Sequence, residues 1–200
     1  MYSIPKIYLL QDLKRVLLNN PGAANEIKKI GLFGGSFNPA HIGHLEISKY
    51  AIDELGMDYA IWLVAEQNPL KPPYEHDLQS RAAFASKLAE HNRILVSIME
   101  SEIKSKCTYD TLLFFIQNFP KLDFTWLMGA DCLFNFHLWE NFDKFTDIVD
   151  IAIFNRSNSE DPKKTIAGKE LLKKRKHHVV FCNNEQIDIS STSIRAANKC

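Results

Sequence analysis

The sequence predicts an α/β protein with a doubly wound parallel sheet. Short apolar runs alternate along the chain with helical patterns, and these runs are continuously apolar, without a polar residue at every second position. Strands of this kind are buried on both faces, which requires a layer of helices on each side of the sheet. The 200 residues are enough for one such domain and a small extension.

The elements can be assigned in order along the chain. In residues 1–28, Ile7, Leu10 and Leu17 share one face of a helix, so we expect an N-terminal helical extension. Residues 29–200 are expected to form a single domain. Its expected strands are residues 30–33, 59–65, 93–99, 122–129, part of 145–156, and 177–182. Its expected helices are residues 42–55, 78–90, 108–119 and 161–176, with a last helix start in 190–200.

Composition excludes several classes of function. Lys plus Arg and Asp plus Glu each number 24, so no overall field attracts nucleic acid or an anionic membrane. No apolar run approaches the roughly 20 residues that cross a bilayer, and we expect no signal peptide. The four cysteines show no CxxC pair, which disfavours a zinc ribbon and a disulfide framework. We therefore expect a cytoplasmic protein with small-molecule partners, no nucleic acid and no membrane, and leave open whether it forms a homo-oligomer.

The loop after the first strand of the domain, GGSFNPAHIGH, carries the most chemistry. Gly34 and Gly35 permit a tight turn and a close approach of backbone to a ligand. The helix that follows presents free backbone N–H groups, which favour an anion, and His41 and His44 add directional donors there. Ligands of parallel sheets bind at the carboxyl ends of the strands. We therefore expect a phosphate site without a Walker lysine.

Two other roles compete for the histidine pair. Residues at i and i+3 can ligate a metal, but no Cys, Asp or Glu nearby completes a tetrahedral set, since Glu46 is expected to point elsewhere on the helix. The pair can also be a structural cap, in which one imidazole bonds backbone carbonyls. The glycines and the position after a strand favour the phosphate role.

This loop resembles the nucleotidyltransferase signature G-x-F-[DN]-P-x-H-x-G-H. The positions that fit are Gly35, Phe37, Asn38, Pro39, His41, Gly43 and His44. The letters H-I-G-H also resemble class I aminoacyl-tRNA synthetases, which share this type of nucleotide site. Within the HxGH superfamily, residues 29–197 are similar to bacterial nicotinate mononucleotide adenylyltransferases. The resemblance implies a Rossmann-like fold and in-line transfer of the adenylyl group of ATP to nicotinate mononucleotide, giving deamido-NAD and pyrophosphate without a covalent enzyme intermediate.

Two stretches in the middle of the chain narrow the match. NPLKPP contains Lys71 in the loop after the second strand of the domain, and Arg81 lies in the next helix, where this family also has an arginine. TYDTL, which begins at Thr108, resembles the family's S-Y-T-x-x-T-L segment. Cys107 stands where a tyrosine is usual, and Lys106 where a serine is usual. These two departures affect one wall of the implied pocket.

The segment MGADCLFNFHLWENF is the most specific to this family. Gly129 and Asp131 lie at the end of a strand, and Trp139 matches the aromatic residue that stacks on the nicotinate ring. A structural alternative is that Phe134, Phe136 and Trp139 are simply core aromatics. The preceding letters GAD favour the binding role for Trp139 alone.

ISSTSIR, at residues 189–195, matches the family's second ATP motif and is also a pattern for a Ser/Thr-rich helix cap. By resemblance, the catalytic residues are His41, His44 and Arg195. The implied ATP-binding residues are Gly34, Gly35, Ser36, Phe37, His41, His44, Gly129, Asp131, Ser190, Ser191, Thr192 and Arg195. The implied mononucleotide-binding residues are Asn38, Lys71, Arg81, Thr108 and Trp139.

The resemblance also implies Mg²⁺ bridging the phosphates of ATP with few protein ligands, Asp131 being a weak candidate. Two alternatives stay open. The acceptor can be another small phosphorylated molecule, nicotinamide mononucleotide or phosphopantetheine, or the chain can be a catalytically weakened nucleotide-binding module, because Lys106 and Cys107 depart from the family. RNA binding, by analogy with the synthetases, is disfavoured by the zero net charge.

Overall fold

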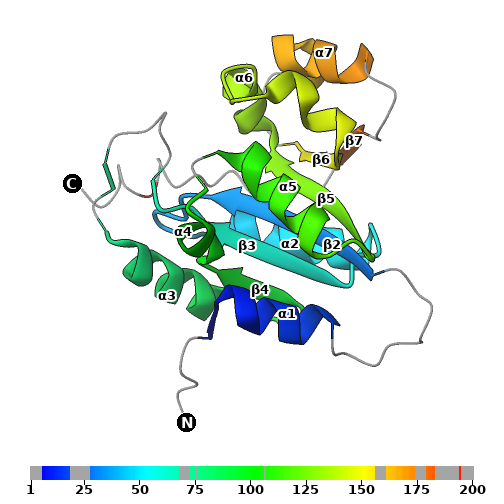
Figure 1. The fold of residues 1–200 in the computed structure, drawn as a ribbon. Coiled ribbons are helices and arrows are strands. Elements are labelled where there is room, and N and C mark those ends of the chain that lie inside the picture. The colour runs from blue at the N-terminus through cyan, green and yellow to red at the C-terminus, as the bar shows by residue number, and fades with distance from the viewer. Residues whose placement is uncertain are drawn as a thin grey trace.

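A computed structural model describes most of the chain, namely residues 6–18, 28–67, 73–74, 76–105, 107–155, 161–173, 179–182 and 194. Within these residues, seven strands form one sheet in the order β1-β4-β3-β2-β5-β6-β7, and each neighbouring pair is parallel (Figure 1). The strand order reverses beside β2, because the chain adds β3 on one side of it and β5 on the other. The expected doubly wound parallel sheet is therefore confirmed.

The strands are β1 (Ile7–Tyr8), β2 (Lys28–Gly35), β3 (Tyr59–Val64), β4 (Ile94–Ser97), β5 (Leu122–Gly129), β6 (Asp150–Phe154) and β7 (Val179–Cys182). The helices are α1 (Leu10–Leu18), α2 (Ile42–Asp53), α3 (Leu78–Leu88), α4 (Met99–Ile103), α5 (Thr108–Asn118), α6 (Leu133–Phe136) and α7 (Ile166–Lys173). Short 3₁₀ turns, η1 (Ala130–Cys132), η2 (Phe142–Asp147) and η3 (Pro162–Lys164), join some of them.

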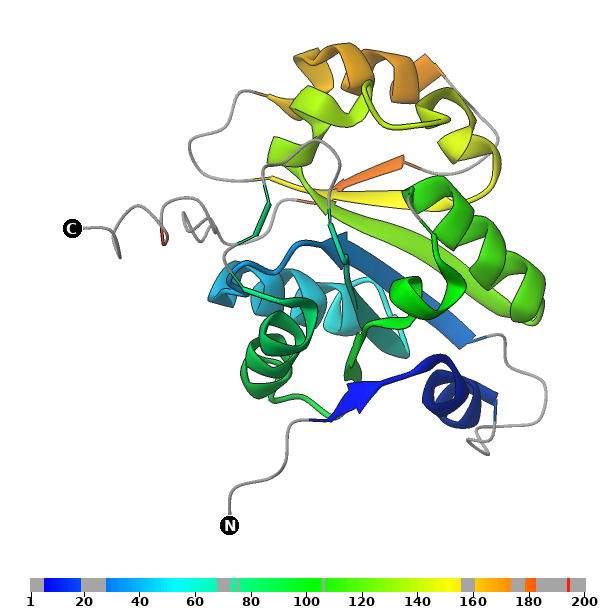
Figure 2. The ribbon, with the colours of Figure 1, turned by 60° about the vertical axis from the view of Figure 1, so that its left-hand side comes forward.

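Two clusters of buried side chains lie on opposite faces of the sheet. Leu13 of α1 and Phe115 of α5 belong to one cluster, whereas Ala51 of α2 and Ala82 of α3 belong to the other. Figure 2 shows the same division, with α2 and α3 on one side of the sheet and α1 and α5 on the other. The continuously apolar strands are explained by this arrangement, because both of their faces are buried.

Several elements differ from the expectation, among them α4 and α6, which the sequence did not predict, and Met99, which was expected in a strand and begins α4. Ile7 was expected in a helix, but Ile7–Tyr8 forms strand β1, which pairs with β4 at the edge of the sheet. The Ser97 hydroxyl donates to the Tyr8 carbonyl (2.7 Å) and holds this short strand in place. Within residues 145–156, the strand is confined to Asp150–Phe154. Within residues 161–176, the short turn η3 precedes the helix, because the Asp161 carboxylate accepts a hydrogen bond from the Lys163 N–H (3.0 Å) and caps that turn. Of the expected last helix start, the structure describes Ile194 alone.

The reversal of strand order positions the site. The ladder between β2 and β5 ends at Leu32 and Trp126, although the two strands continue to Gly35 and Gly129. Beyond that point β2 pairs with β3 and β5 pairs with β6, so the carboxyl ends of the two central strands belong to different halves of the sheet. Open α/β sheets bind their ligands at this kind of position.

Candidate active site

His41 and His44 contact each other at the start of α2. His41 is the N-cap residue with an extended backbone, and its N–H donates to Nδ1 of His44 (3.1 Å). In return the His44 N–H donates to the His41 carbonyl (2.9 Å), and the two ring centroids are 3.8 Å apart. Because Nδ1 of His44 accepts a hydrogen bond, the proton of its neutral ring lies on Nε2. His44 is thus prepared as a donor through Nε2.

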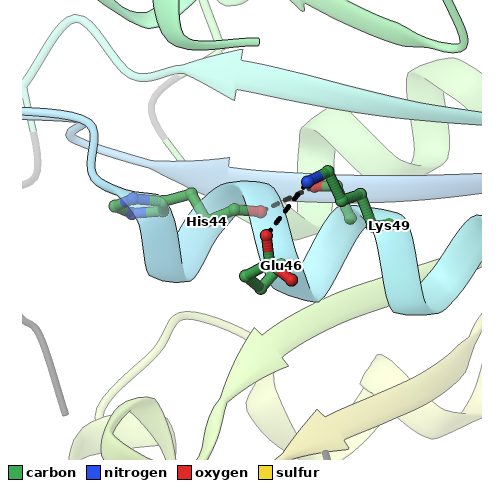
Figure 3. Close-up of polar contacts among 4 residues, drawn as sticks. His44, Glu46 and Lys49 are labelled. Carbon is green, nitrogen blue, oxygen red and sulfur yellow. Dashed lines mark hydrogen bonds and ion pairs between the residues drawn. The ribbon is translucent and has the colours of Figure 1, made fainter. Parts of the chain in front are cut away.

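Figure 3 shows the His44 ring at the N-terminal end of α2, while Glu46 and Lys49 lie further along the helix. Lys49 Nζ and Glu46 Oε1 form an ion pair with each other (3.1 Å), as an i, i+3 pair on the helix surface. Glu46 therefore points away from the histidine pair, as the sequence predicted. The Glu46 carboxylate therefore does not join the two imidazoles as a metal ligand.

Buried hydrogen bonds fix the backbone under His44. The Ser48 hydroxyl donates to the His44 carbonyl (2.9 Å), and Nε1 of Trp62 donates to the Ser48 hydroxyl oxygen (2.7 Å). Ser48 and Trp62 are completely buried. Buried polar groups of this kind specify one arrangement, because breaking a bond leaves an unsatisfied group in the core. The first turns of α2 are consequently anchored to β3.

The ring of Phe37 packs against the His44 ring and against Trp62. Its ring is 1% exposed, stacks on Trp62 with centroids 5.1 Å apart, and lies 4.7 Å from the His44 ring. Its φ of 45° is in the left-handed region, which costs a non-glycine residue about 1–3 kcal/mol. Burying the phenyl ring offsets this cost by about 1.5–3 kcal/mol. Because the ring is buried, Phe37 can contact a nucleotide through its backbone only.

Gly34 is required by packing inside the protein. A Cβ atom at Gly34 would lie 2.3 Å from Cη2 of Trp126, so the indole ring occupies the space that any side chain needs. Ser36 and Asn38, which follow in the loop, are also buried. The sequence indicated the glycine but gave no sign of its partner, because Trp126 appears there as one more apolar residue of a strand.

The second set of expected residues lies around β5. Gly129 is the buried end of β5, and Asp131 is exposed in η1. Trp139 is half-buried and packs edge-on against Trp126 (6.3 Å between centroids) and Phe136 (5.1 Å). Trp126 therefore contacts both Gly34 and Trp139, and it links the loop after β2 to the aromatic segment after β5.

The aromatic residues after β5 include both core residues and residues that are exposed enough to contact a ligand. Phe136 is fully buried and belongs to the core, whereas Phe134 is 44% exposed. Trp139 has an intermediate position, because its ring is packed on one side by Phe136 and Phe145 and is still partly exposed. This geometry permits Trp139 to contact a ligand while resting on the core.

Thr108 is the first residue of α5, and a partly buried carboxyl group that sequence reasoning missed stabilises this helix. The Thr111 hydroxyl donates to Oε1 of Glu100 on α4 (2.9 Å). Burial raises the pKa of Glu100 from 4.5 to about 7, and the hydrogen bond from Thr111 partly opposes that rise. The Ser105 hydroxyl closes the intervening turn on the Cys107 carbonyl (2.9 Å).

Arg81 is buried in the first turn of α3 and is 3% exposed. The sequence suggested a contact with substrate, but in the structure its guanidinium donates to backbone carbonyls, including that of Ser36 (2.5 Å). Burial lowers the pKa of Arg81 from its ordinary value, although that value is so high that the guanidinium stays charged at neutral pH.

Several expected residues lie outside the described residues. They are Lys71, Lys106, Ser190, Ser191, Thr192 and Arg195. Their roles stay predictions. Among the residues that the structure does describe, no three His, Cys, Asp or Glu side chains gather as a metal-ligand set, and no helix is long and apolar enough to cross a membrane.

Comparison with known proteins places the chain among related sequences. The family model described as cytidylyltransferase-like matches residues 32–197. A Methylorubrum extorquens protein named "Probable nicotinate-nucleotide adenylyltransferase" is 44% identical over 132 residues, which are 64% of this chain and 70% of the relative. A Cereibacter sphaeroides protein of the same name is 33% identical over 181 residues, 85% of this chain and 98% of the relative.

A solved structure shares the fold. Plasmodium falciparum nicotinic acid mononucleotide adenylyltransferase, complexed with NaAD, superposes with a TM-score of 0.69. The match covers 84% of this chain and 83% of the other, at 19% sequence identity. At that identity the likeness concerns the arrangement of strands and helices, which agrees with the Rossmann-like order of the sheet.

Proposed function

This chain belongs to the cytidylyltransferase-like family, and within it to the nicotinate-nucleotide adenylyltransferases, and we propose that it transfers the adenylyl group of ATP to nicotinate mononucleotide in NAD biosynthesis. The 5′-phosphate oxygen of the mononucleotide forms a bond to the α-phosphorus of ATP as the bond from that phosphorus to the leaving pyrophosphate breaks. The products are deamido-NAD and pyrophosphate. The attacking phosphate is already ionised, so the reaction needs no nucleophile or general base from the enzyme.

The observation that carries this proposal is the paired arrangement of His41 and His44 at the carboxyl end of β2. Phosphoryl-type transfer depends on aligning polyanions and stabilising charge that spreads over the transferring group. Alignment of reactants can supply about 7–11 kcal/mol of a barrier. The hydrogen bond from His41 N–H to Nδ1 of His44 (3.1 Å) leaves the Nε2–H of His44 as a fixed donor. His44 would donate to the α-phosphate oxygens in the transition state.

The remaining roles follow the order of the elements. We assign Ser36, the neighbouring backbone N–H groups and His41 to the phosphates of ATP, and Gly129 and Asp131 to the nucleotide. Arg195 would complete the catalytic set with the two histidines. The β- and γ-phosphates are assigned to Ser190, Ser191, Thr192 and Arg195. The mononucleotide is assigned to Asn38, Lys71, Thr108 and Trp139, whereas the guanidinium of Arg81 donates to backbone carbonyls inside the protein and is treated separately below.

Family relationship implies a divalent metal ion with ATP, and we propose Mg²⁺. The groups at the start of α2 are two imidazoles and backbone N–H groups, which suit phosphate oxygens better than a hard cation. Such a site fits Mg²⁺ that is held mainly by phosphate oxygens and water, with Asp131 as a weak candidate ligand. Bound there, the ion would neutralise charge on the triphosphate and the leaving pyrophosphate.

Partners and location follow from the same function. The proposed partners are ATP and nicotinate mononucleotide, with no nucleic acid and no membrane, in the cytoplasm. The zero net charge supports this view, because binding of a nucleic acid backbone relies on many cationic side chains. A homo-oligomer stays a prediction to be checked by light scattering.

The test is a pyrophosphate-release assay on the purified chain with ATP, Mg²⁺ and one acceptor at a time. Nicotinate mononucleotide is expected to give the highest kcat/KM, ahead of nicotinamide mononucleotide and phosphopantetheine. A higher value with either of the other acceptors would reassign the substrate. Release with none of them, while ATP still binds, would make the chain a nucleotide-binding module.

A further inference from the structure

Arg81 is placed by a helix cap that begins α3. Asp77 is the N-cap, and its carboxylate accepts hydrogen bonds from the Ser80 N–H (2.8 Å) and the Ser80 hydroxyl (3.0 Å). A capped first turn has a defined position relative to the sheet. Arg81 follows directly and projects into the protein, where its side chain is 3% exposed.

The guanidinium joins three backbone segments. Its Nη1 donates to the carbonyls of Ser36 (2.5 Å) and Ala65 (2.8 Å), its Nη2 to that of Glu66 (2.9 Å), and its Nε to that of His76 (3.2 Å). Ser36 is in the loop after β2, Ala65 and Glu66 follow β3, and His76 precedes α3. Because the five N–H groups of arginine lie in one rigid plane, the acceptors are held in fixed relative positions.

These contacts satisfy a buried cation without a carboxylate partner in the described part of the chain. Among the described residues, the hydrogen bonds of Arg81 all go to backbone carbonyls, and the centroid of the Tyr74 ring lies 4.5 Å from its Cζ. Hydrogen bonds from a charged donor are stronger than neutral ones. A cation solvated by carbonyls therefore holds those carbonyls firmly, and four of the five N–H groups are occupied in doing so.

We propose that Arg81 is a positioning residue that holds the loop of residues 36–41 against the carboxyl end of β3 and thereby sets the place of His44. The effect of Arg81 on kcat rests on the proposed function, because it assumes that the chain transfers the adenylyl group. The path is continuous: Arg81 holds the Ser36 carbonyl, Phe37 is the next residue, and its ring lies 4.7 Å from that of His44. The Ala65 N–H bonds the Gly35 carbonyl (2.9 Å) beside it.

The competing role for Arg81 is direct contact with the phosphate or carboxylate of a substrate. That role requires N–H groups that face the ligand, whereas the structure turns four of them to carbonyls inside the protein. The two roles differ in kinetics. Loss of a direct contact weakens binding and raises KM, whereas displacement of a transition-state donor lowers kcat.

The experiment compares Arg81→Lys with Arg93→Lys. Arg93 is a matched control, because its Nη2 pairs with Asp53 on the surface (3.1 Å). Activities are measured per folded molecule, at a temperature where circular dichroism shows each variant folded. A lysine cannot reach all four carbonyls, so we expect kcat to fall by about tenfold to a hundredfold in Arg81→Lys, with far smaller changes in both KM values. Arg93→Lys should keep the kcat of the parent chain.

Three outcomes would overturn the inference. They are an unchanged kcat in Arg81→Lys, a lower Tm as its sole effect, and a raised KM for one substrate at constant kcat, which would assign Arg81 to that substrate. A truncated variant, Arg81→Ala, adds a rescue test with methylguanidinium. Recovery of kcat without a change in Tm would support positioning, and failure to recover would count against it.

Nitrogen-15 spectra of the histidine rings separate this inference from the proposed function, because they need no substrate. In the parent chain we expect His44 as the neutral ring protonated at Nε2. Arg81→Lys should shift the His41 and His44 signals and leave those of His91 unchanged. Identical spectra would refute the positioning role even if the chain transfers no adenylyl group. Shifted spectra in an inactive parent chain would refute the proposed function alone.

Discussion

The neighbours of His44 determine which nitrogen of its ring carries the proton that the proposed chemistry uses. The His41 N–H occupies Nδ1, the Ser48 hydroxyl holds the backbone carbonyl, and the Phe37 ring packs beside the imidazole. An exposed histidine would interconvert between tautomers, whereas this one is kept in the form that donates through Nε2. The catalytic property thus belongs to a small group of residues and not to one side chain.

Removal of this donor should affect chemistry more than folding. For His44→Ala we expect kcat to fall by about 10²–10³, as for other preorganised donors, with a far-ultraviolet circular dichroism spectrum like that of the parent chain. Pyrophosphate release gives the rate. Lys49→Ala is the control, because Lys49 is on the same helix and pairs with Glu46. Near-normal turnover in His44→Ala would remove His44 from the mechanism.

Trp139 should act on one substrate. Because its half-buried ring rests on Trp126 and Phe136, we expect Trp139→Ala to raise the KM for nicotinate mononucleotide while the KM for ATP changes little. The fully buried Phe136 supplies the comparison: Phe136→Ala should cost about 3–5 kcal/mol of unfolding free energy instead. Equal losses for both substrates in Trp139→Ala would place Trp139 in the core.

At the scale of elements, α4 and α5 are joined through the partly buried carboxyl group of Glu100. Thr111 of α5 donates to Glu100 of α4, and the turn between them is closed by Ser105 on the Cys107 carbonyl. This turn leads directly into Thr108, the first residue of α5. We therefore expect a change in the charge of Glu100 to affect the position of Thr108, in the segment proposed to bind the mononucleotide.

The raised pKa of Glu100 predicts a dependence of stability on pH. The folded chain binds this proton up to a pH of about 7, and the unfolded chain releases it near pH 4.5. The folded form thus holds more protons between these values, so unfolding free energy should fall as pH rises, by at most about 1.4 kcal/mol per pH unit.

Glu100→Gln isolates this effect, because glutamine keeps an acceptor for Thr111 and does not titrate. Urea unfolding of both chains at pH 5, 6, 7 and 8 gives the comparison. We expect the variant to gain stability relative to the parent chain as pH rises. A constant difference across this range would show that Glu100 titrates normally.

At the scale of the whole molecule, the N-terminal segment shares the core of the sheet. Strand β1 pairs with β4, and Glu102 of α4 accepts a hydrogen bond from the Leu10 N–H at the start of α1 (2.7 Å). Leu13 and Leu17 are buried in the same cluster as Phe115 of α5. The division into an extension and a domain stays a prediction, but these contacts predict that the two unfold together.

Truncation of one buried side chain tests that coupling. For Leu13→Ala, at a fully buried position, we expect a loss of about 2–5 kcal/mol in one cooperative unfolding transition. Leu18→Ala on the same helix is the control, since Leu18 is 53% exposed and should change stability little. Two separate transitions would show that the extension folds independently.

The sequence by itself determined most of the alternation of strands and helices and the parallel sheet, and it predicted the loop of residues 34–44 as the nucleotide site. These features depend on local periodicity, on turn-forming residues and on a motif contained within residues 34–44. The segment Ile7–Tyr8 was misassigned, because a strand of two residues has no periodicity of its own and exists through its pairing with β4.

Tertiary structure alone decided how the site residues are held. Trp126 packs on Gly34, Glu100 accepts from Thr111, and Arg81 bonds Ser36 across an interval of 45 residues. These contacts join residues of different elements, 11 positions apart for Glu100 and Thr111 and 45 for Ser36 and Arg81, so the local pattern does not record them. The direction of the Arg81 side chain, which donates to the Ser36 carbonyl, likewise depends on which strands the fold brings together.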